Sequence, residues 1–327
     1  MGKTINSMNG PRILVVRLGS MGDVIAALPA VASLKQSLPG ASMSWIVEPH
    51  WAPLLEGNPC LSQIILLDRT NLSSTLASLR KLRSQHFDFA VDFQGLVKSA
   101  VLASLARADR IYGFDRRAAR ESAASWFYSH RVPLRNYHAV ERNLDLAAGA
   151  GATSLLKQFP LPAGVPEGRL PDRPFVLASP LAGWGAKQWP LEYYSELGLR
   201  LRRECGMTLV INAAQPVEVP NTVVHVSTLA GLIDATRRAS AVVGVDSGPL
   251  HLAAALGKPG VAIYGPTEPA RHGPYGESIA VLRDPSAETT YKRTEQPAAS
   301  MRAITPDMVF AQLVRMVQPE SQAQRRG

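Results

Sequence analysis

The chain has 327 residues, 46% of them hydrophobic, and it carries 35 Lys and Arg against 26 Asp and Glu. This length exceeds that of one typical domain and allows a large buried core, so we expect two domains.

A strand, a glycine turn and a helix are predicted at the start of the chain. The apolar run at 12–17 (RILVVR) indicates a buried strand, and the apolar spacing over 23–40 indicates a helix. A glycine turn between such elements usually receives a phosphate, because free N–H groups and the helix dipole attract anions. Here the turn (RLGSMGDV) ends in Asp23, whose carboxylate would repel a phosphate charge at 4 Å by about 4 kcal/mol at an effective dielectric near 20. Asp23 therefore either serves a reaction or caps the helix, the latter worth about 0.3–1 kcal/mol.

Strands and helices continue to alternate along the rest of the chain. Further strands are predicted at 43–48, 62–68 and 87–95, with a helical segment at 74–86. The segment 159–174 is too rich in proline and glycine for either element and is the predicted linker. After it, strands are predicted at 175–180, 207–212, 240–246 and 260–265, with helices at 191–205 and 249–257. This pattern predicts two α/β units in tandem, each with a parallel sheet.

Polar residues collect where the strands of the second unit end. Lys187 follows the first of these strands, where an ammonium group can meet a pyrophosphate. A later strand ends in Asp246, and Ser247 and Gly248 then open a helix whose hydroxyl and N–H groups suit phosphate, with His251 one turn later. The alternative is a solvated lysine, a capping Asp-Ser pair and a hydrogen-bonded core histidine. Because ligands bind at the carboxyl ends of strands in open α/β sheets, we expect these side chains to line a cleft between two facing units.

The positive charge is concentrated in the first half of the chain. Residues 1–160 contain 18 Lys and Arg against 11 Asp and Glu, whereas the remaining residues contain 17 against 15. This asymmetry indicates either an anionic partner, such as nucleic acid, a membrane surface or a phosphorylated substrate, or a solvated basic surface. No zinc-finger spacing or RNP-type motif supports nucleic acid. The sequence also lacks G-x-G-x-x-G and G-x-x-x-x-G-K-[ST], which disfavours a dehydrogenase or a P-loop enzyme.

Six segments, in family order, resemble the ADP-heptose:lipopolysaccharide heptosyltransferases. They are ILVVRLGSMGDVIAALPA at 13–30, AVDFQGLVKSA at 90–100, RESAASWFY at 120–128, HAVER at 138–142, KQWP at 187–190 and VDSGPLHLAAALGKPGVAIYGPTEP at 245–269. The combination of S-M-G-D with D-[ST]-G-x-x-H is specific for this family, and D-x-Q-G-L-V-K-S is typical of members that add the first heptose. The resemblance covers most of the chain.

The resemblance implies a GT-B fold, in which two Rossmann-like α/β domains face each other across a cleft. Residues 1–165 would bind the acceptor and residues 166–327 the nucleotide sugar, with the final helix, at about 306–317, crossing back onto the first domain. The implied reaction is inverting transfer of heptose from ADP-L-glycero-β-D-manno-heptose to the Kdo residue of Kdo-lipid A, in synthesis of the lipopolysaccharide inner core. The implied setting is cytoplasmic, at the anionic surface of the inner membrane, without nucleic acid and without a cofactor or metal.

The resemblance also implies roles for individual residues. Asp23 would be the general base that takes the proton of the acceptor hydroxyl, which accounts for a carboxylate in the glycine turn. At a helix N-terminus its pKa is expected to be low, so that it is ionised at neutral pH. Lys187 would bind the donor phosphates and Glu218 the ribose. The other implied donor-binding residues are Asp246, Ser247, Gly248 and His251, and the implied acceptor-binding residues are Lys98, Arg120, Ser20 and Gly22.

Two segments depart from the family pattern. AGWG at 182–185 replaces a pair of threonines that usually precedes the lysine, and the segment after Glu218 is too short for the helix that usually follows it. A glycosyltransferase of the same family with another nucleotide sugar or acceptor is therefore an alternative. A more distant alternative is a nucleotide-binding protein without turnover, although retention of Asp23 beside Gly22 argues against it.

Overall fold

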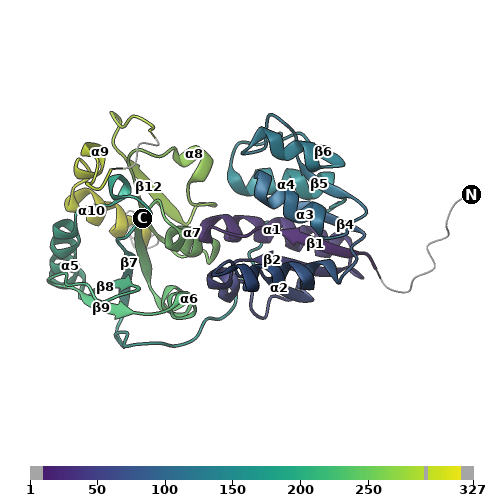
Figure 1. Cartoon of the computed structure of the whole chain (residues 1–327). Coiled ribbons are helices and arrows are strands. Elements are labelled where there is room, and N and C mark those ends of the chain that lie inside the picture. Colours follow the sequence, from purple (N-terminus) through teal and green to yellow (C-terminus); the bar gives the residue numbers. More distant parts are fainter. Residues whose placement is uncertain (1–9, 291–293, 318–327) are drawn as a thin grey trace, which may run out of the picture. The chain divides into compact units, whose positions relative to one another are not determined.

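The structure, a computed structural model, describes residues 10–290 and 294–317. The chain divides into two compact units, one ending at Pro162 and the other beginning at Ala163. The boundary expected from the sequence was three residues later, after residue 165. Over the described residues, each unit contains a six-stranded parallel sheet with helices packed on it (Figure 1). The α/β class and the parallel sheets predicted from the sequence are confirmed.

The N-terminal sheet has the strand order β3-β2-β1-β4-β5-β6. Its strands are β1 (Arg12–Val16), β2 (Ser42–Val47), β3 (Gln63–Leu66), β4 (Phe89–Asp92), β5 (Ile111–Phe114) and β6 (His130–Val132). Its helices are α1 (Met21–Ser37), α2 (Leu72–Arg83), α3 (Val97–Leu105) and α4 (Ala139–Gly149), with 3₁₀ turns η1 (Pro49–Leu54) and η2 (Ser122–Phe127). This is the strand order of a Rossmann-type sheet, in which the direction of winding reverses between β1 and β4.

Two helix layers cover the N-terminal sheet. On one face, Leu14 and Val16 of β1 share a buried cluster with Leu82 of α2 and Leu102 of α3. Because successive side chains of a strand point to opposite faces, the alternate buried residues of β1 face the other layer. That layer consists of α1 and α4, which pack against each other. The helices therefore form a layer of α2, α3 and η2 and a layer of α1 and α4.

The C-terminal sheet has the order β12-β11-β10-β7-β8-β9. Its strands are β7 (Phe175–Ser179), β8 (Thr208–Ala213), β9 (Val223–Val226), β10 (Ala241–Val245), β11 (Gly260–Tyr264) and β12 (Ile279–Arg283). Its helices are α5 (Leu191–Cys205), α6 (Leu229–Arg238), α7 (Gly248–Ala255), α8 (Pro269–His272), α9 (Ala299–Arg302) and α10 (Pro306–Val317), with a 3₁₀ turn η3 (Gly185–Lys187). This sheet repeats the Rossmann-type order, with the reversal between β7 and β10.

The last described helix, α10, belongs to the C-terminal unit. It packs on α5 and on strands β10, β11 and β12. Its apolar side chains Val309, Phe310 and Leu313 are buried in the same cluster as Trp189 and Ile263. The expectation that this helix crosses back onto the N-terminal domain is corrected by this packing, because its apolar face is used within the C-terminal core.

Candidate functional site

The sheet topology places the predicted site residues at one edge of each unit. The carboxyl ends of parallel strands share an edge, and ligands of such sheets bind where the winding reverses. In the N-terminal unit that point lies between β1, which leads to Asp23, and β4, which ends in Asp92. In the C-terminal unit it lies between β7, which leads to Lys187, and β10, which leads to Asp246. Each unit therefore has charged residues at its expected ligand edge.

Asp23 lies in the first turn of α1 and is held by charged and polar neighbours. Its Oδ2 accepts hydrogen bonds from the backbone N–H and the hydroxyl of Ser20, both at 3.2 Å, and its Oδ1 lies 2.5 Å from Nη2 of Arg17. Burial raises the pKa of Asp23, but the charge of Arg17, the Ser20 bonds and the charge of Arg120 together hold it below its usual value. The side chain is still 28% exposed. Asp23 is therefore an ionised carboxylate open to a ligand, with Ser20 and Gly22 beside it.

Sequence reasoning missed Arg17, the ion-pair partner of Asp23. This arginine is buried, with 7% of its surface exposed, and it follows the apolar strand β1 directly. One guanidinium nitrogen, Nη1, donates to the carbonyl of Phe93, and the backbone carbonyl of Arg17 accepts from the indole of Trp45 at 3.0 Å. A charged residue at the end of an otherwise apolar run was the signal in the sequence. Arg17 links the turn that carries Asp23 to the loop that follows β4.

A second missed residue, Asp92, organises that loop. Its carboxylate is fully buried and accepts hydrogen bonds from the hydroxyls of Ser99 and Tyr128, each at 2.7 Å, and from the N–H of Gln94 at 2.8 Å. Burial raises the pKa of Asp92 despite these bonds. The side chain of Gln94 in turn accepts from the N–H of Leu18 at 2.9 Å. Asp92 thus fixes the loop that supports the turn before Asp23.

Lys98 and Arg120 are both exposed and lie along the same edge. Lys98 is in the first turn of α3, where the N–H of Val97 donates to the carboxylate of Glu121 at 2.7 Å. Arg120 precedes Glu121 directly, and its charge acts on Asp23. Both cations therefore lie at the edge of the sheet that carries Asp23, and their role in acceptor binding stays a prediction.

In the C-terminal unit, Lys187 and Asp246 form a nearly buried ion pair. The ammonium lies 2.8 Å from Oδ2 of Asp246, and the two side chains are 13% and 11% exposed. His251 lies on the other side, with Nε2 3.8 Å from Oδ1 of Asp246. Ser247 occupies the N-cap position of α7, which begins at Gly248, but its buried hydroxyl has no hydrogen-bond partner among the described residues. The arrangement combines a cation, a helix N-terminus and an unsatisfied hydroxyl, which together suit a phosphate group.

The unusual AGWG segment places an aromatic ring against this lysine. The Lys187 ammonium lies 4.8 Å from the centre of the Trp184 ring, within the range of a cation–π contact. The turn is held by the chain on its far side, because Ala186 donates to the carbonyl of Thr294 at 3.1 Å and accepts from Ala298 at 3.2 Å. An indole ring therefore lies against the ammonium group of Lys187.

Glu218 lies apart from this cluster in the sequence and at a different strand end. It is exposed on the loop between β8 and β9, and that loop contains no helix, as the short spacing predicted. Among the residues that the structure describes, its carboxylate makes no ion pair or hydrogen bond. Since β8 neighbours β7 in the sheet, Glu218 still belongs to the carboxyl edge that carries Lys187.

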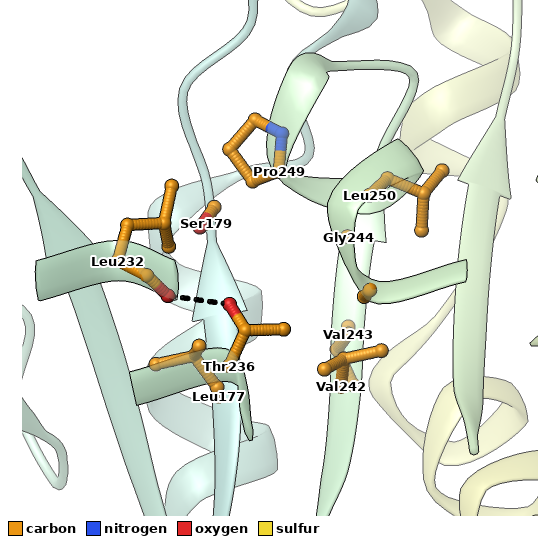
Figure 2. A pocket seen from close by; sticks show the side chains of 10 residues that line it. Leu177, Ser179, Leu232, Thr236, Val242, Val243, Gly244, Pro249 and Leu250 are labelled. Atoms are coloured by element: carbon orange, nitrogen blue, oxygen red, sulfur yellow. Dashed lines mark hydrogen bonds between the residues drawn. The ribbon is translucent and has the colours of Figure 1, made fainter. Parts of the chain in front are cut away.

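A small pocket lies below this edge, under the first turns of α7 (Figure 2). Its lining is mostly apolar and includes Leu177 and Leu250. Its polar side chains are Ser179 and Thr236, and the hydroxyl of Thr236 donates to the carbonyl of Leu232 at 2.7 Å. Neither Lys187 nor Asp246 lines it. The pocket is a gap in the packing of α6 and α7 on the sheet, and the charged edge above it is the candidate ligand site.

Two features are absent from the described residues. In the ranges 10–290 and 294–317, no three His, Cys, Asp or Glu side chains are gathered so that they could hold a metal ion. Over the same ranges, none of the helices combines the length and the apolar character needed to cross a bilayer.

Known proteins resemble the chain along most of its length. Residues 75–301 match the family described as glycosyltransferase family 9 (heptosyltransferase). The chain is 33% identical over 302 residues to the lipopolysaccharide heptosyltransferase 1 of Pseudomonas aeruginosa, and the match covers 82% of each chain. It is similar to the solved structure of Escherichia coli heptosyltransferase WaaC with ADP, at a TM-score of 0.77 and 27% identity, covering 93% of this chain and 99% of that one. The same enzyme with ADP-2-deoxy-2-fluoro heptose gives a TM-score of 0.72 at 27% identity, covering 91% and 97%.

Proposed function

Because the chain belongs to glycosyltransferase family 9, the heptosyltransferases, we propose that it transfers heptose from ADP-L-glycero-β-D-manno-heptose to the Kdo residue of Kdo-lipid A. The main structural support for the proposal is that Asp23 is an ionised but accessible carboxylate at the expected ligand edge of a Rossmann-type sheet. The P. aeruginosa relative is named as a lipopolysaccharide heptosyltransferase, and the WaaC structures hold ADP or an ADP-heptose analogue, which supports this donor and pathway.

The C-terminal edge would bind the nucleotide sugar. Lys187, the N–H groups of Ser247 and Gly248 and the Ser247 hydroxyl would receive the pyrophosphate, with His251 beside them. Glu218 would accept hydrogen bonds from the ribose. As the bond between the sugar and the ADP oxygen breaks, negative charge grows on the leaving phosphate, and a positive side chain and helix terminus stabilise that charge. These groups supply the stabilisation from the protein itself, so we propose transfer without a metal or other cofactor.

The N-terminal edge would bind the acceptor and start the reaction. The acceptor hydroxyl attacks the anomeric carbon, the bond to ADP breaks on the opposite side, and Asp23 takes the hydroxyl proton. Because attack and departure occur on opposite sides, the configuration at that carbon is inverted. Because the neighbours of Asp23 hold its pKa low, it is always ionised but is a weak base. Proton transfer is therefore expected late in the step, once the attacking oxygen has become acidic.

The acceptor itself is anionic, since Kdo carries a carboxylate and lipid A carries phosphates. Lys98 and Arg120 would bind these groups, and Ser20 and Gly22 would shape the turn beside the reacting hydroxyl. The excess of positive charge in residues 1–160 suits such an acceptor and the anionic membrane in which its lipid is embedded. We therefore propose that the protein works at the cytoplasmic surface of the inner membrane.

Release of ADP tests the proposed reaction. With purified protein and ADP-heptose, ADP is expected to appear quickly when Kdo-lipid A is present and only slowly when it is absent, and the lipid product should gain the mass of one heptose. ADP-glucose and ADP-mannose serve as matched donors. If one of these donors is turned over as fast as ADP-heptose, the protein uses a different donor. The Trp184 ring beside Lys187 is the structural feature that would account for such a change. No ADP release with any donor and this acceptor would contradict the proposal.

Loss of either exposed cation should weaken acceptor binding selectively. Lys98→Ala and Arg120→Ala are each expected to raise the KM for Kdo-lipid A about 10- to 100-fold, because a charge-assisted contact is worth about 1.5–3 kcal/mol. The KM for ADP-heptose should stay unchanged. Arg203→Ala, on an exposed part of α5, is the matched control. An unchanged acceptor KM in both variants would move the acceptor away from this edge.

A further inference from the structure

The two helix layers of the N-terminal sheet differ in what they expose. In the layer of α2, α3 and η2, Leu72 is 74% exposed and Trp126 is 71% exposed. Three further large apolar side chains of this layer are also exposed, Leu76, Val101 and Phe127. The opposite layer is different, since no large hydrophobic side chain of α1 or α4, both fully described, is exposed. One helix layer of the unit therefore carries five exposed large apolar side chains, and the other carries none on its helices.

The packing explains why these side chains remain outside. Helix α2 inserts Leu82 into the core beneath it, and this is its one buried side chain. The turn η2 packs through Ala124 on Ala100 of α3. These contacts cover the sheet side of the layer and leave Leu72 and Trp126 mostly outside the packing. Such a surface on a monomer marks an interaction site.

The charges on the two layers also differ in sign. Helices α2 and α3 carry Arg80, Lys81, Arg83 and Lys98, and neither they nor η2 contain an Asp or Glu. These four cations form no ion pair with any described carboxylate. A further cation lies beside η2, since Nε of Arg131 donates to the carbonyl of Ser125 at 2.9 Å.

The carboxylates near this layer are engaged elsewhere. Glu121, at the start of η2, accepts from the N–H of Val97, and Asp109 lies 2.8 Å from the His86 ring. The opposite helices α1 and α4 carry Asp23, Glu141 and Asp145 against two cations. The apolar layer is therefore also the basic one.

We propose that the layer of α2, α3 and η2 docks on an anionic lipid bilayer. Leucine side chains and an exposed tryptophan suit the boundary between headgroups and acyl chains, and unpaired Lys and Arg side chains are attracted by anionic headgroups. The inference rests on the proposed function for its setting, because a lipid-anchored acceptor must be reached from a membrane surface. Lys98 belongs to both regions, since the first turn of α3 lies at the acceptor edge and its outer side lies in the docking layer.

Binding to vesicles tests the surface without any reaction. Wild-type protein is expected to sediment with vesicles of phosphatidylcholine and phosphatidylglycerol at 7:3, and to partition at least about tenfold less into phosphatidylcholine alone. Raising the salt concentration should weaken binding to the anionic vesicles, because exposed charges are screened. Equal partition into both vesicle types would overturn the proposal.

Charge reversal places the binding on this layer. Lys81→Glu/Arg83→Glu should lower partition into the anionic vesicles at least about tenfold, since each cation at the surface contributes and each reversal adds repulsion. Arg203→Glu/Arg315→Glu changes the net charge equally on exposed residues of α5 and α10 and should retain binding. A loss of the same size in both double variants would mean that net charge, and not this layer, causes the binding, and would overturn the proposal.

The emission of Trp126 gives an independent readout. Of the five tryptophans, Trp45 and Trp189 are fully buried, and Trp51 and Trp184 are half-buried on other elements, so Trp126 is the tryptophan whose surroundings should change most when the layer meets lipid. Anionic vesicles are expected to shift the wild-type emission to shorter wavelength, and Trp126→Phe should abolish the shift. An unchanged wild-type emission in the presence of bound vesicles would contradict docking by this layer.

Two further measurements distinguish lipid docking from dimerisation and from the proposed enzymatic function. Dimers in vesicle-free solution that Trp126→Ser dissociates would assign the layer to a second copy of the chain, and would overturn lipid docking. ADP-heptose turnover tests the proposed function separately: vesicle binding without turnover would contradict only the function, and turnover without vesicle binding would contradict only the docking surface.

Discussion

Replacing Asp23 by Ala is expected to lower kcat at least about 100-fold and to leave the affinity for ADP nearly unchanged. Loss of a general base typically costs about 10²- to 10⁴-fold in rate. ADP affinity should survive because Asp23 lies on the N-terminal unit, whereas the groups suited to phosphate, Lys187 and the start of α7, lie on the C-terminal unit. Single-turnover transfer and calorimetric titration with ADP measure the two quantities.

Asp23→Asn separates catalysis from helix capping. The amide oxygen can still accept the two Ser20 hydrogen bonds, so α1 should begin at the same residue, but the amide cannot take a proton. A kcat as low as that of Asp23→Ala, in protein that is still folded at the assay temperature, supports the base. A near-normal kcat in either variant would return Asp23 to a capping role.

Arg17→Gln provides a matched control of the electrostatics. Without the Arg17 charge, burial would weigh more heavily and the pKa of Asp23 should rise. The carboxylate of Asp23 is active when ionised, so activity is lost as the pH falls through its pKa. In the variant, the acidic limb of the kcat profile should therefore move to higher pH.

The main strands could be predicted because each is a short, almost purely apolar run. The run at 12–17 became β1, and its buried residues reflect a sheet covered on both faces. Four strands, β5, β6, β9 and β12, were not predicted. The shortest of them, the edge strand β6, has three residues, of which His130 and Arg131 are exposed. Edge strands with mixed polarity carry too weak a period to detect.

The placement of α10 was predicted wrongly for a physical reason. Its apolar stripe, which includes Val309 and Leu313, shows that one face is buried but does not show against what. The helix could cover either sheet, and the family resemblance favoured the N-terminal one. The packing on α5 and β11 is a tertiary choice that the local pattern does not contain.

Positions of the site residues could be predicted, but their partners could not. Turns at strand ends identified Asp23, Lys187 and Asp246, since their spacing from apolar runs is local. The pairing of Lys187 with Asp246 joins residues 59 positions apart, and it depends on β7 and β10 lying side by side in the sheet. Asp92 was overlooked because a carboxylate at a strand end looks alike in sequence whether it is buried or exposed to a ligand.

Replacing Lys187 by Met is expected to weaken ADP binding at least about tenfold and to lower kcat about 100-fold. A charge-assisted contact to phosphate is worth about 1.5–3 kcal/mol, and the loss is greater in the rate because charge on the leaving phosphate grows in the transition state. Met keeps an unbranched apolar side chain at this position while it removes the ammonium that lies over the Trp184 ring.

Lys187→Met also breaks the ion pair between Lys187 and Asp246. Removing Lys187 leaves the carboxylate of Asp246, 11% exposed, without its cation, so part of the effect could be structural. Lys187→Met/Asp246→Asn removes the unpaired charge and should restore the melting temperature, but it should restore neither ADP affinity nor kcat if the ammonium acts on the phosphates. Recovery of both in the double variant would show that Lys187 only neutralises Asp246. Unchanged ADP binding in Lys187→Met and in Asp246→Ala would place the donor elsewhere on the C-terminal unit.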